Sequence, residues 1–154
     1  MKLAIASDLH IEFGDIILDN IVTKADVLIL AGDICMLKDL DKESERGERT
    51  RNFFKRVSLA FPRILYVMGN HEHYHGRLDK TWHQLIDIMP DNVTVLDQEC
   101  EEYRGVLFLG GTLWTDLNRG DWHTAYHLKH SMNDFHVIQN YYTVGARYGK
   151  LTPE

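Results

Sequence analysis

Three short apolar runs in the first half of the chain each lead directly into polar residues, by way of a serine or a glycine. The runs are Leu3–Ser7, Val27–Ala31 and Ile64–Met68, and none of them alternates between apolar and polar residues. Continuous apolar runs of this length are typical of strands that a parallel sheet buries on both faces, whereas alternation is typical of half-exposed strands. The runs therefore predict parallel strands in the interior of an α/β fold.

Two helices are predicted to accompany these strands. The first ends near Pro62, and its apolar side chains share one helical face: Phe53, Val57, Ala60 and Phe61. The second is stopped by Pro90 and repeats the same spacing at Leu78, Trp82, Leu85, Ile86 and Met89. Alternation of strands and helices is the pattern of an α/β fold.

The second half of the chain has a different pattern. Val93–Leu96 predicts one more short strand, and residues 101–109 predict a hairpin with its turn at Gly105. Residues 121–137 are predicted to be helical. The candidate core contacts of that helical segment are Trp122, Tyr126, Met132 and Phe135.

Length and composition limit what such a fold can be. With 154 residues, the chain is predicted to form a single domain over residues 1–154. Its net charge of −6 argues against general nucleic-acid binding, which needs a basic surface. No apolar run approaches the roughly 18 residues of a membrane span. We therefore expect no membrane partner. Cys35 and Cys100 form neither a disulfide framework nor a Cys-x-x-Cys pair, so we expect reduced thiols in a cytoplasmic protein.

Residues with metal-binding groups follow each of the three runs. Asp8 and His10 come after the first run, Asp33 after the second, and Asn70 and His71 after the third. In open α/β sheets, sites form beyond the carboxyl ends of strands that lie about 4.8 Å apart, so these side chains can converge. Two carboxylates, an amide and two imidazoles, without a thiolate, suit Mn, Fe or Zn. The two oxygens of Asp33 would let this residue bridge two metal ions.

Each of these motifs is weak evidence by itself. An isolated aspartate after a strand is as consistent with a turn or a helix cap as with a metal ligand. Three motifs in this order, each directly behind an apolar run, favour one site over three unrelated turns. Gly32 and Gly69 precede candidate ligands, where the absence of a Cβ permits a sharp turn.

The motifs resemble those of a known family over residues 2 to about 115. Asp8-x-His10, Gly32-Asp33 and Gly69-Asn70-His71-Glu72 are similar to the first three motifs of the calcineurin-like metallophosphoesterases. Gly110–Trp114 also resembles a segment of small bacterial and phage members. The resemblance implies an α/β/β/α sandwich and a hydrolase that acts on a phosphate mono- or diester at a binuclear metal centre.

The resemblance also implies a role for each site residue. Asp8 and His10 would hold the first metal, Asp33 would bridge, and Asn70 would hold the second. His71 would protonate the leaving oxygen or stabilise the transition state, and Glu72 would orient His71. The two ions would be Mn, Fe or Zn, and manganese is the metal that we expect first.

Two later motifs of the family are not found in this sequence. They are a histidine after a further strand and a Gly-His-x-His near the C-terminus, and no histidine after His71 follows a glycine. In the family these histidines complete both metal shells. We therefore expect a truncated product or an N-terminal fragment, with an incomplete sandwich, at most one firmly held metal and very low activity. The uncovered apolar faces are expected to cause self-association or to bind a completing partner.

The motifs that are present and those that are missing lead to two candidate functions from different classes. The first is a metal-dependent phosphoesterase that acts on a phosphoester substrate. The alternative is a catalytically weak or inactive remnant that serves as a metal-binding or interaction domain. A histidine-rich zinc module ranks third, because the chain offers no thiolate ligand box.

The remaining histidines and Cys35 are assigned structural positions. His73 and His75 are expected in a surface loop. His123, His127 and His130 share one helical face, which we expect to be solvated rather than to bind zinc. Cys35 is expected to be a small buried hydrophobic residue.

Overall fold

The computed structural model describes residues 1–18, 25–40, 43–142 and 147–152. At its centre is a four-stranded parallel sheet whose strand order, β1-β2-β3-β4, follows the chain. The strands are β1 (Leu3–Ala6), β2 (Val27–Ala31), β3 (Ile64–Val67) and β4 (Val93–Leu96). The predicted α/β fold with parallel strands is confirmed.

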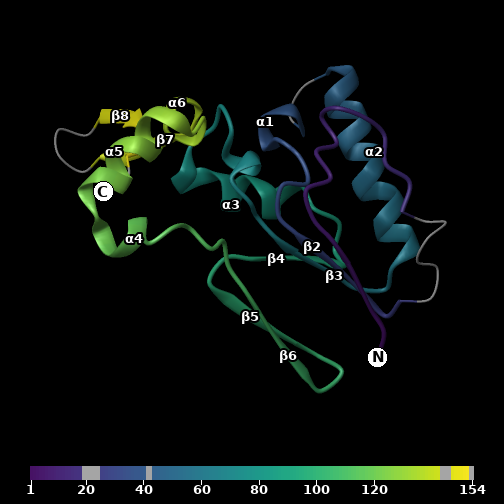
Figure 1. Ribbon diagram of the computed structural model, residues 1–154. Helices are drawn as coiled ribbons and strands as arrows, with labels where there is room; N and C mark the ends of the chain where they lie inside the picture. Colours follow the sequence, from purple (N-terminus) through teal and green to yellow (C-terminus); the bar gives the residue numbers. More distant parts are fainter. Residues whose placement is uncertain (19–24, 41–42, 143–146, 153–154) are drawn as a thin grey trace.

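Helices cover one face of this sheet (Figure 1). Crossovers between parallel strands share one hand, so a strand order that follows the chain places every crossover on the same side. The helices are α1 (Leu37–Leu40), α2 (Glu45–Ala60) and α3 (Leu78–Ile88). Side chains from this layer and the strands form one buried core, which includes Leu28, Leu30, Phe53, Phe54, Val57, Ile64, Tyr66 and Leu85. Each such burial contributes about 1.5–3 kcal/mol, so this layer holds the strands in place.

The boundaries of the two longer helices follow from local sequence. Ser44 caps α2, because its hydroxyl oxygen accepts a hydrogen bond from the Gly47 backbone N–H at 3.1 Å. α2 ends at Ala60, shortly before Pro62, and α3 ends at Ile88, shortly before Pro90. Both ends agree with the prediction.

A hairpin, rather than helices, lies on the opposite face of the sheet. It consists of β5 (Glu99–Tyr103) and β6 (Val106–Gly110), joined by a turn at Arg104 and Gly105 with φ of 51° and 76°. Such left-handed pairs fit the twist of a two-residue hairpin turn. Tyr103 and Phe108 point toward the sheet, where they pack against Val27, Leu65 and Leu96.

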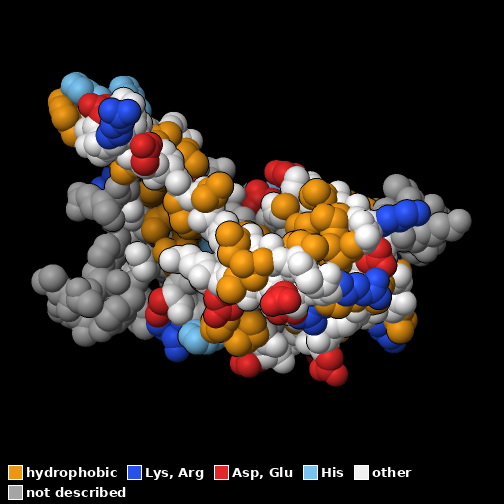
Figure 2. Space-filling view, turned by 90° about the horizontal axis from the view of Figure 1, so that it is seen from below, with side chains coloured by type: hydrophobic (Ala, Val, Ile, Leu, Met, Phe, Trp, Pro, Cys, Tyr) orange, Lys and Arg blue, Asp and Glu red, His pale blue; other side chains and the backbone are white. Residues whose placement is uncertain are grey.

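The hairpin covers this face only in part. On β1, Leu3 and Ile5 are 46% and 70% exposed, and on the outer side of the hairpin Leu107 and Leu109 are 59% and 79% exposed. Seen from below, the molecule shows hydrophobic side chains spread over its surface (Figure 2). The sheet therefore has one closed face and one partly open face.

The chain continues beyond the hairpin into a group of short elements. They are α4 (Leu117–Gly120), α5 (Trp122–Ser131), α6 (Asp134–Val137), β7 (Gln139–Tyr142) and β8 (Arg147–Lys150). α4 is a left-handed turn rather than a regular helix, since Asn118 and Arg119 have φ of 54° and 63°. β7 and β8 form an antiparallel ribbon.

The helix predicted over residues 121–137 is interrupted. α5 ends at Ser131 and α6 begins at Asp134, with Met132 in an extended conformation between them. Trp122, Tyr126 and Met132 are exposed and are not core contacts, contrary to the prediction. Phe135 is buried and packs with Ile138 and Leu151. The prediction failed because, among the described residues, α5 packs on no sheet: Trp122 and Tyr126 face solvent. Leu128 packs instead against the buried cluster that contains Phe135.

The two cysteines differ in exposure. Cys35 is buried, as expected, while Cys100 is exposed, and both are unpaired. None of the helices in the described part of the chain is both long and apolar enough to cross a membrane.

Candidate metal centre

The loops after β1 and β2 are joined by main-chain hydrogen bonds. The Asp8 N–H donates to the Gly32 carbonyl and the His10 N–H donates to the Asp33 carbonyl, both at 3.0 Å. Asp8, His10 and Asp33 have φ of 54°, 44° and 55°. Left-handed backbone costs a non-glycine residue about 1–3 kcal/mol and is concentrated at functional sites. Three such residues in one pair of joined loops point to a site there.

The loops after β2 and β3 meet through glycines. Gly32 has φ of 89°, and a Cβ on it would lie 3.1 Å from Cα of Gly69. A Cβ on Gly69 would lie 2.2 Å from Oδ1 of Asp33, far inside van der Waals contact. The two loops therefore approach as closely as bare main chain permits.

Glu72 braces these loops. Its buried carboxylate accepts hydrogen bonds from the backbone N–H groups of Asp33 at 3.1 Å, Ile34 at 2.7 Å and Gly69 at 2.7 Å, and from the Tyr66 hydroxyl at 2.7 Å. Burial raises the pKa of Glu72, and the hydrogen bond from Tyr66 and those from the backbone act in the opposite direction. The prediction that Glu72 orients His71 is wrong, because these donors occupy its carboxylate.

Three of the predicted metal ligands form a compact set. Asp8, His10 and Asp33 each bring one ligand atom to within 4.8 Å of the others. Ligand atoms with bonds of about 2.0–2.2 Å to one ion lie up to roughly 4.4 Å apart, so small side-chain adjustments would let this set enclose a divalent ion. The Asp33 carboxylate is also held by the backbone N–H of His71, which donates to Oδ1 at 3.0 Å.

Asn70 lies beside this set and is oriented by a residue from far along the chain. Its Nδ2 donates to Oδ1 of Asp134 at 2.8 Å, and the Tyr74 hydroxyl donates to the same oxygen at 2.7 Å. Burial, with the hydrogen bond to Asp134 as a second cause, raises the pKa of Tyr74, so the hydroxyl stays a donor. With Nδ2 engaged, Oδ1 of Asn70 is the atom available as a ligand.

His71 contacts a different carboxylate from the one predicted. Its Nδ1 lies 3.0 Å from Oε1 of Glu12, and Glu12 also lies 3.2 Å from Nδ1 of His10. The ring of Tyr74 stacks on His71 with centroids 4.1 Å apart. His10, Glu12 and His71 are thus a second set of mutually close ligand atoms.

A groove of about 760 Å³ opens beside the first ligand set. Its lining includes Asp8, Asp33 and Asn70, residues 109–115, and Asp134, which contacts Asn70. The described residues that line this groove include three carboxylates and neither lysine nor arginine. The groove brings together Asp8, Asp33 and Asn70. His10 and His71 lie next to this lining, because His10 shares a ligand set with Asp8 and Asp33 and His71 is the neighbour of Asn70, and both contact Glu12.

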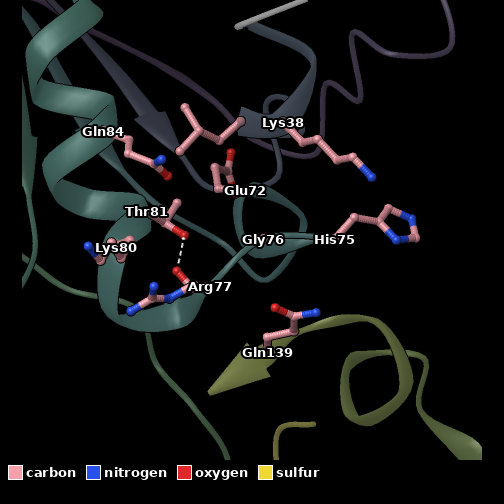
Figure 3. Close-up of a pocket in the computed structure, with 10 residues that line it drawn as sticks. Lys38, Glu72, His75, Gly76, Arg77, Lys80, Thr81, Gln84 and Gln139 are labelled. Atoms are coloured by element: carbon pink, nitrogen blue, oxygen red, sulfur yellow. Dashed lines mark hydrogen bonds between the residues drawn. The ribbon is translucent and has the colours of Figure 1, made fainter. Parts of the chain in front are cut away.

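A second cavity, of about 470 Å³, lies between α1, α3 and β7. Its lining includes Lys38, His75 and Lys80. In Figure 3 the amino groups of Lys38 and Lys80 extend away from each other, so they form no joint anion site.

The other histidines divide into buried and exposed. His73 is 3% exposed, which contradicts its predicted surface position, and burial lowers its pKa to about 4. His75 is exposed, as predicted. His123, His127 and His130 on α5 are exposed, so their predicted position on a solvated face is confirmed.

Three residues of the site were not predicted: Glu12, Tyr74 and Asp134. Asp8, His10 and Glu12 stand two residues apart in the sequence, and this regular spacing of metal-binding groups was the available signal. Asp134 stands more than 60 positions from Asn70, and no local pattern marks it.

Comparison with known proteins supports the resemblance seen in the motifs. A model of the calcineurin-like phosphoesterase family matches residues 1–147. "Uncharacterized protein L509" of Acanthamoeba polyphaga mimivirus is 26% identical over 155 residues, an alignment that covers 89% of this chain and 51% of the relative. The chain thus spans about half the length of this curated relative.

Proposed function

The chain belongs to the calcineurin-like phosphoesterase family, whose members are metal-dependent phosphoester hydrolases, and on that premise we propose that it hydrolyses a phosphate mono- or diester in the groove beside Asp8, Asp33 and Asn70. The observation that carries the proposal is the convergence of three loops on that groove. Asp8, His10 and Asp33 each bring one ligand atom to within 4.8 Å of the others.

The charge of the groove supports a metal-dependent reaction. A phosphoester is anionic, and three aspartates line the groove without a lysine or an arginine among the described lining residues. Cations are therefore needed to bring substrate and protein together. Divalent ions also lower the pKa of a bound water and clamp the phosphoryl oxygens.

The two ions would have different numbers of protein ligands. Asp8, His10 and Asp33 would hold the first ion, with Asp33 as the bridge, while Asp33 and Asn70 would hold the second. A set of one shared carboxylate and one neutral amide is poor, so the proposal includes one firmly held ion. Oxygen and imidazole ligands suit manganese, iron or zinc.

His71 would act as the general acid. It would donate a proton from Nε2 to the leaving oxygen, a contribution of typically 10²–10⁴-fold in rate. Its ring is fixed for this role by Glu12 and by Tyr74.

The test combines manganese titration by calorimetry with turnover of a nitrophenyl phosphodiester. We expect one tight manganese per chain, and both binding and turnover lost to background in Asp33→Ala. The matched control is Asp91→Ala, which removes an exposed carboxylate and should change neither. Turnover that is unaffected by Asp33→Ala would disprove the proposal.

A second candidate role is a non-catalytic domain that binds a metal or a partner. The partly open face of the sheet, with Ile5 70% exposed, and the outer side of the hairpin, with Leu109 79% exposed, favour it. Tight manganese binding without turnover above that of Asp33→Ala would support this role instead.

A further inference from the structure

Glu12 is a buried carboxylate that contacts two imidazoles of the site. Its side chain is 1% exposed, and Oε1 lies 3.0 Å from Nδ1 of His71 and 3.2 Å from Nδ1 of His10. An ionised carboxylate only accepts hydrogen bonds, so contacts of Oε1 with two ring nitrogens favour hydrogen on both Nδ1 atoms. Nε2, on the opposite edge of each ring, then faces away from Glu12.

The ring of His71 is also confined on its faces. Tyr74 stacks on it with centroids 4.1 Å apart and an angle of 24°, and His10 meets it edge-on with centroids 4.3 Å apart. These contacts oppose a flip of the ring that would exchange its two nitrogens. The carboxylate therefore acts on a ring that already has one orientation.

We propose that Glu12 is a positioning residue, which holds His71 with hydrogen on Nδ1 and so presents Nε2 to the leaving oxygen. The last step rests on the proposed function. When the phosphorus–oxygen bond breaks, its electron pair stays with the leaving oxygen, which takes the Nε2 proton of the imidazolium. His71 is then left neutral, with its Nδ1 hydrogen still donated to Glu12.

The same carboxylate serves His10. With hydrogen on its Nδ1, His10 has Nε2 available as a metal ligand. Carboxylates that accept a hydrogen bond from a ligating histidine fix its tautomer and orientation in many metal sites. Glu12 thus orients both a predicted metal ligand, His10, and the predicted general acid, His71.

A purely structural role explains this arrangement poorly. Oε2 of Glu12 is buried with no hydrogen-bond partner among the described residues, and such an oxygen is costly to bury. Arg49, the nearby cation, donates to the backbone carbonyls of Ile11 and Glu12 at 3.3 Å. The observed hydrogen bonds to the carboxylate therefore come from the two imidazoles.

The first arm of the test reads the tautomer directly. Long-range ¹H–¹⁵N spectra at about pH 8, where imidazoles are neutral, distinguish Nδ1–H from Nε2–H in each histidine. We expect the Nδ1–H form of His71 in the wild type and in Glu12→Gln, whose amide oxygen still accepts, and its loss in Glu12→Met. Glu45→Met is the matched control, because it makes the same change at an exposed carboxylate.

The second arm uses two phosphodiesters that differ only in the leaving group. Nitrophenolate leaves without protonation, whereas phenolate, with a pKa near 10 like that of tyrosine, benefits from an acid. Glu12→Met should lower kcat about 10²-fold for the phenyl ester and less than about tenfold for the nitrophenyl ester, since only the first depends on the acid. A merely structural defect would lower both equally.

Three results would overturn the proposal. The first is an Nε2–H tautomer of His71 in the wild type, and the second is an Nδ1–H tautomer that persists in Glu12→Met. The third is loss of the Nδ1 hydrogen of His71 when manganese is added, which would make the His10, Glu12 and His71 set a metal site. The tautomer is read without substrate, so absence of turnover would count against the proposed function and not against the tautomer.

Discussion

The two halves of the chain treat their apolar side chains differently. Among the described residues, the buried hydrophobic ones lie before residue 97 with only three exceptions, Phe135, Ile138 and Leu151. In the second half Leu109 is 79% exposed, Leu113 98% and Trp122 67%. Parallel strands with crossovers on one side build a core as the chain proceeds, whereas a hairpin and short helices leave their outer sides open.

This difference explains where the candidate site lies. The loops after β1, β2 and β3 all belong to the half that has the core, and Glu72 ties two of them together. The left-handed backbone of Asp8, His10 and Asp33 is held there by hydrogen bonds between these loops. The second half contributes a wall of the groove and one carboxylate, Asp134.

The largest expected effect tests whether the core of the first half is the main source of stability. Phe53, buried between α2 and the sheet, should cost about 3–5 kcal/mol of unfolding free energy when changed to Ala. Leu109→Ala, in the second half, should stay within about 0.5 kcal/mol. Urea denaturation measures both. Equal losses would erase the contrast between the halves.

An intermediate effect concerns pH and compares a buried histidine with an exposed one. The pKa of His73 is lowered by burial to about 4 from an unfolded value near 6.5, so protons bind the unfolded state preferentially between these values. Its contribution is fully present above about pH 6.5, and about 3 kcal/mol is lost as the pH falls toward 4.

The measurement is urea denaturation from neutral to acid pH. His73→Leu should lose less stability than the wild type over that range, because the titrating group is gone. His123→Leu, at an exposed position on α5, should follow the wild type. If all three curves fall in parallel, His73 is not the group responsible.

The smallest effect tests whether the second half contributes to the site. Asp134→Ala removes the acceptor that holds Asn70 and should weaken manganese affinity by about 10- to 100-fold, the usual range for groups that orient a ligand. Asp87→Ala, an exposed change on α3, is the control. Unchanged affinity in Asp134→Ala would confine the site to the first half.

The sequence predicted the first half better than the second for physical reasons. Continuous apolar runs such as Val27–Ala31 specify buried strands, and glycines before polar residues marked the loops where candidate ligands meet. In the second half, the spacing of Trp122 and Tyr126 correctly predicts a helix, but spacing alone does not determine whether that helix is buried against other elements. The β7–β8 ribbon was not predicted either.

Within the site, the types of residue were easier to predict than their contacts. Glu72 was expected to orient His71 because of the family resemblance, yet its carboxylate accepts hydrogen bonds from the backbone of the loops after β2 and β3 instead. Contacts such as Asn70 with Asp134 depend on tertiary packing across a long stretch of chain, which no local pattern encodes.

The contact between Gly69 and Asp33 limits how this site could change over evolutionary time. Any amino acid that replaces glycine adds at least a Cβ, and at position 69 that atom would lie 2.2 Å from a carboxylate oxygen of Asp33. There is no residue of intermediate size, so the spacing between the second and third loops cannot drift by small steps at this position. A lineage that needed wider spacing would have to reach it through changes elsewhere in the chain, with Gly69 left in place.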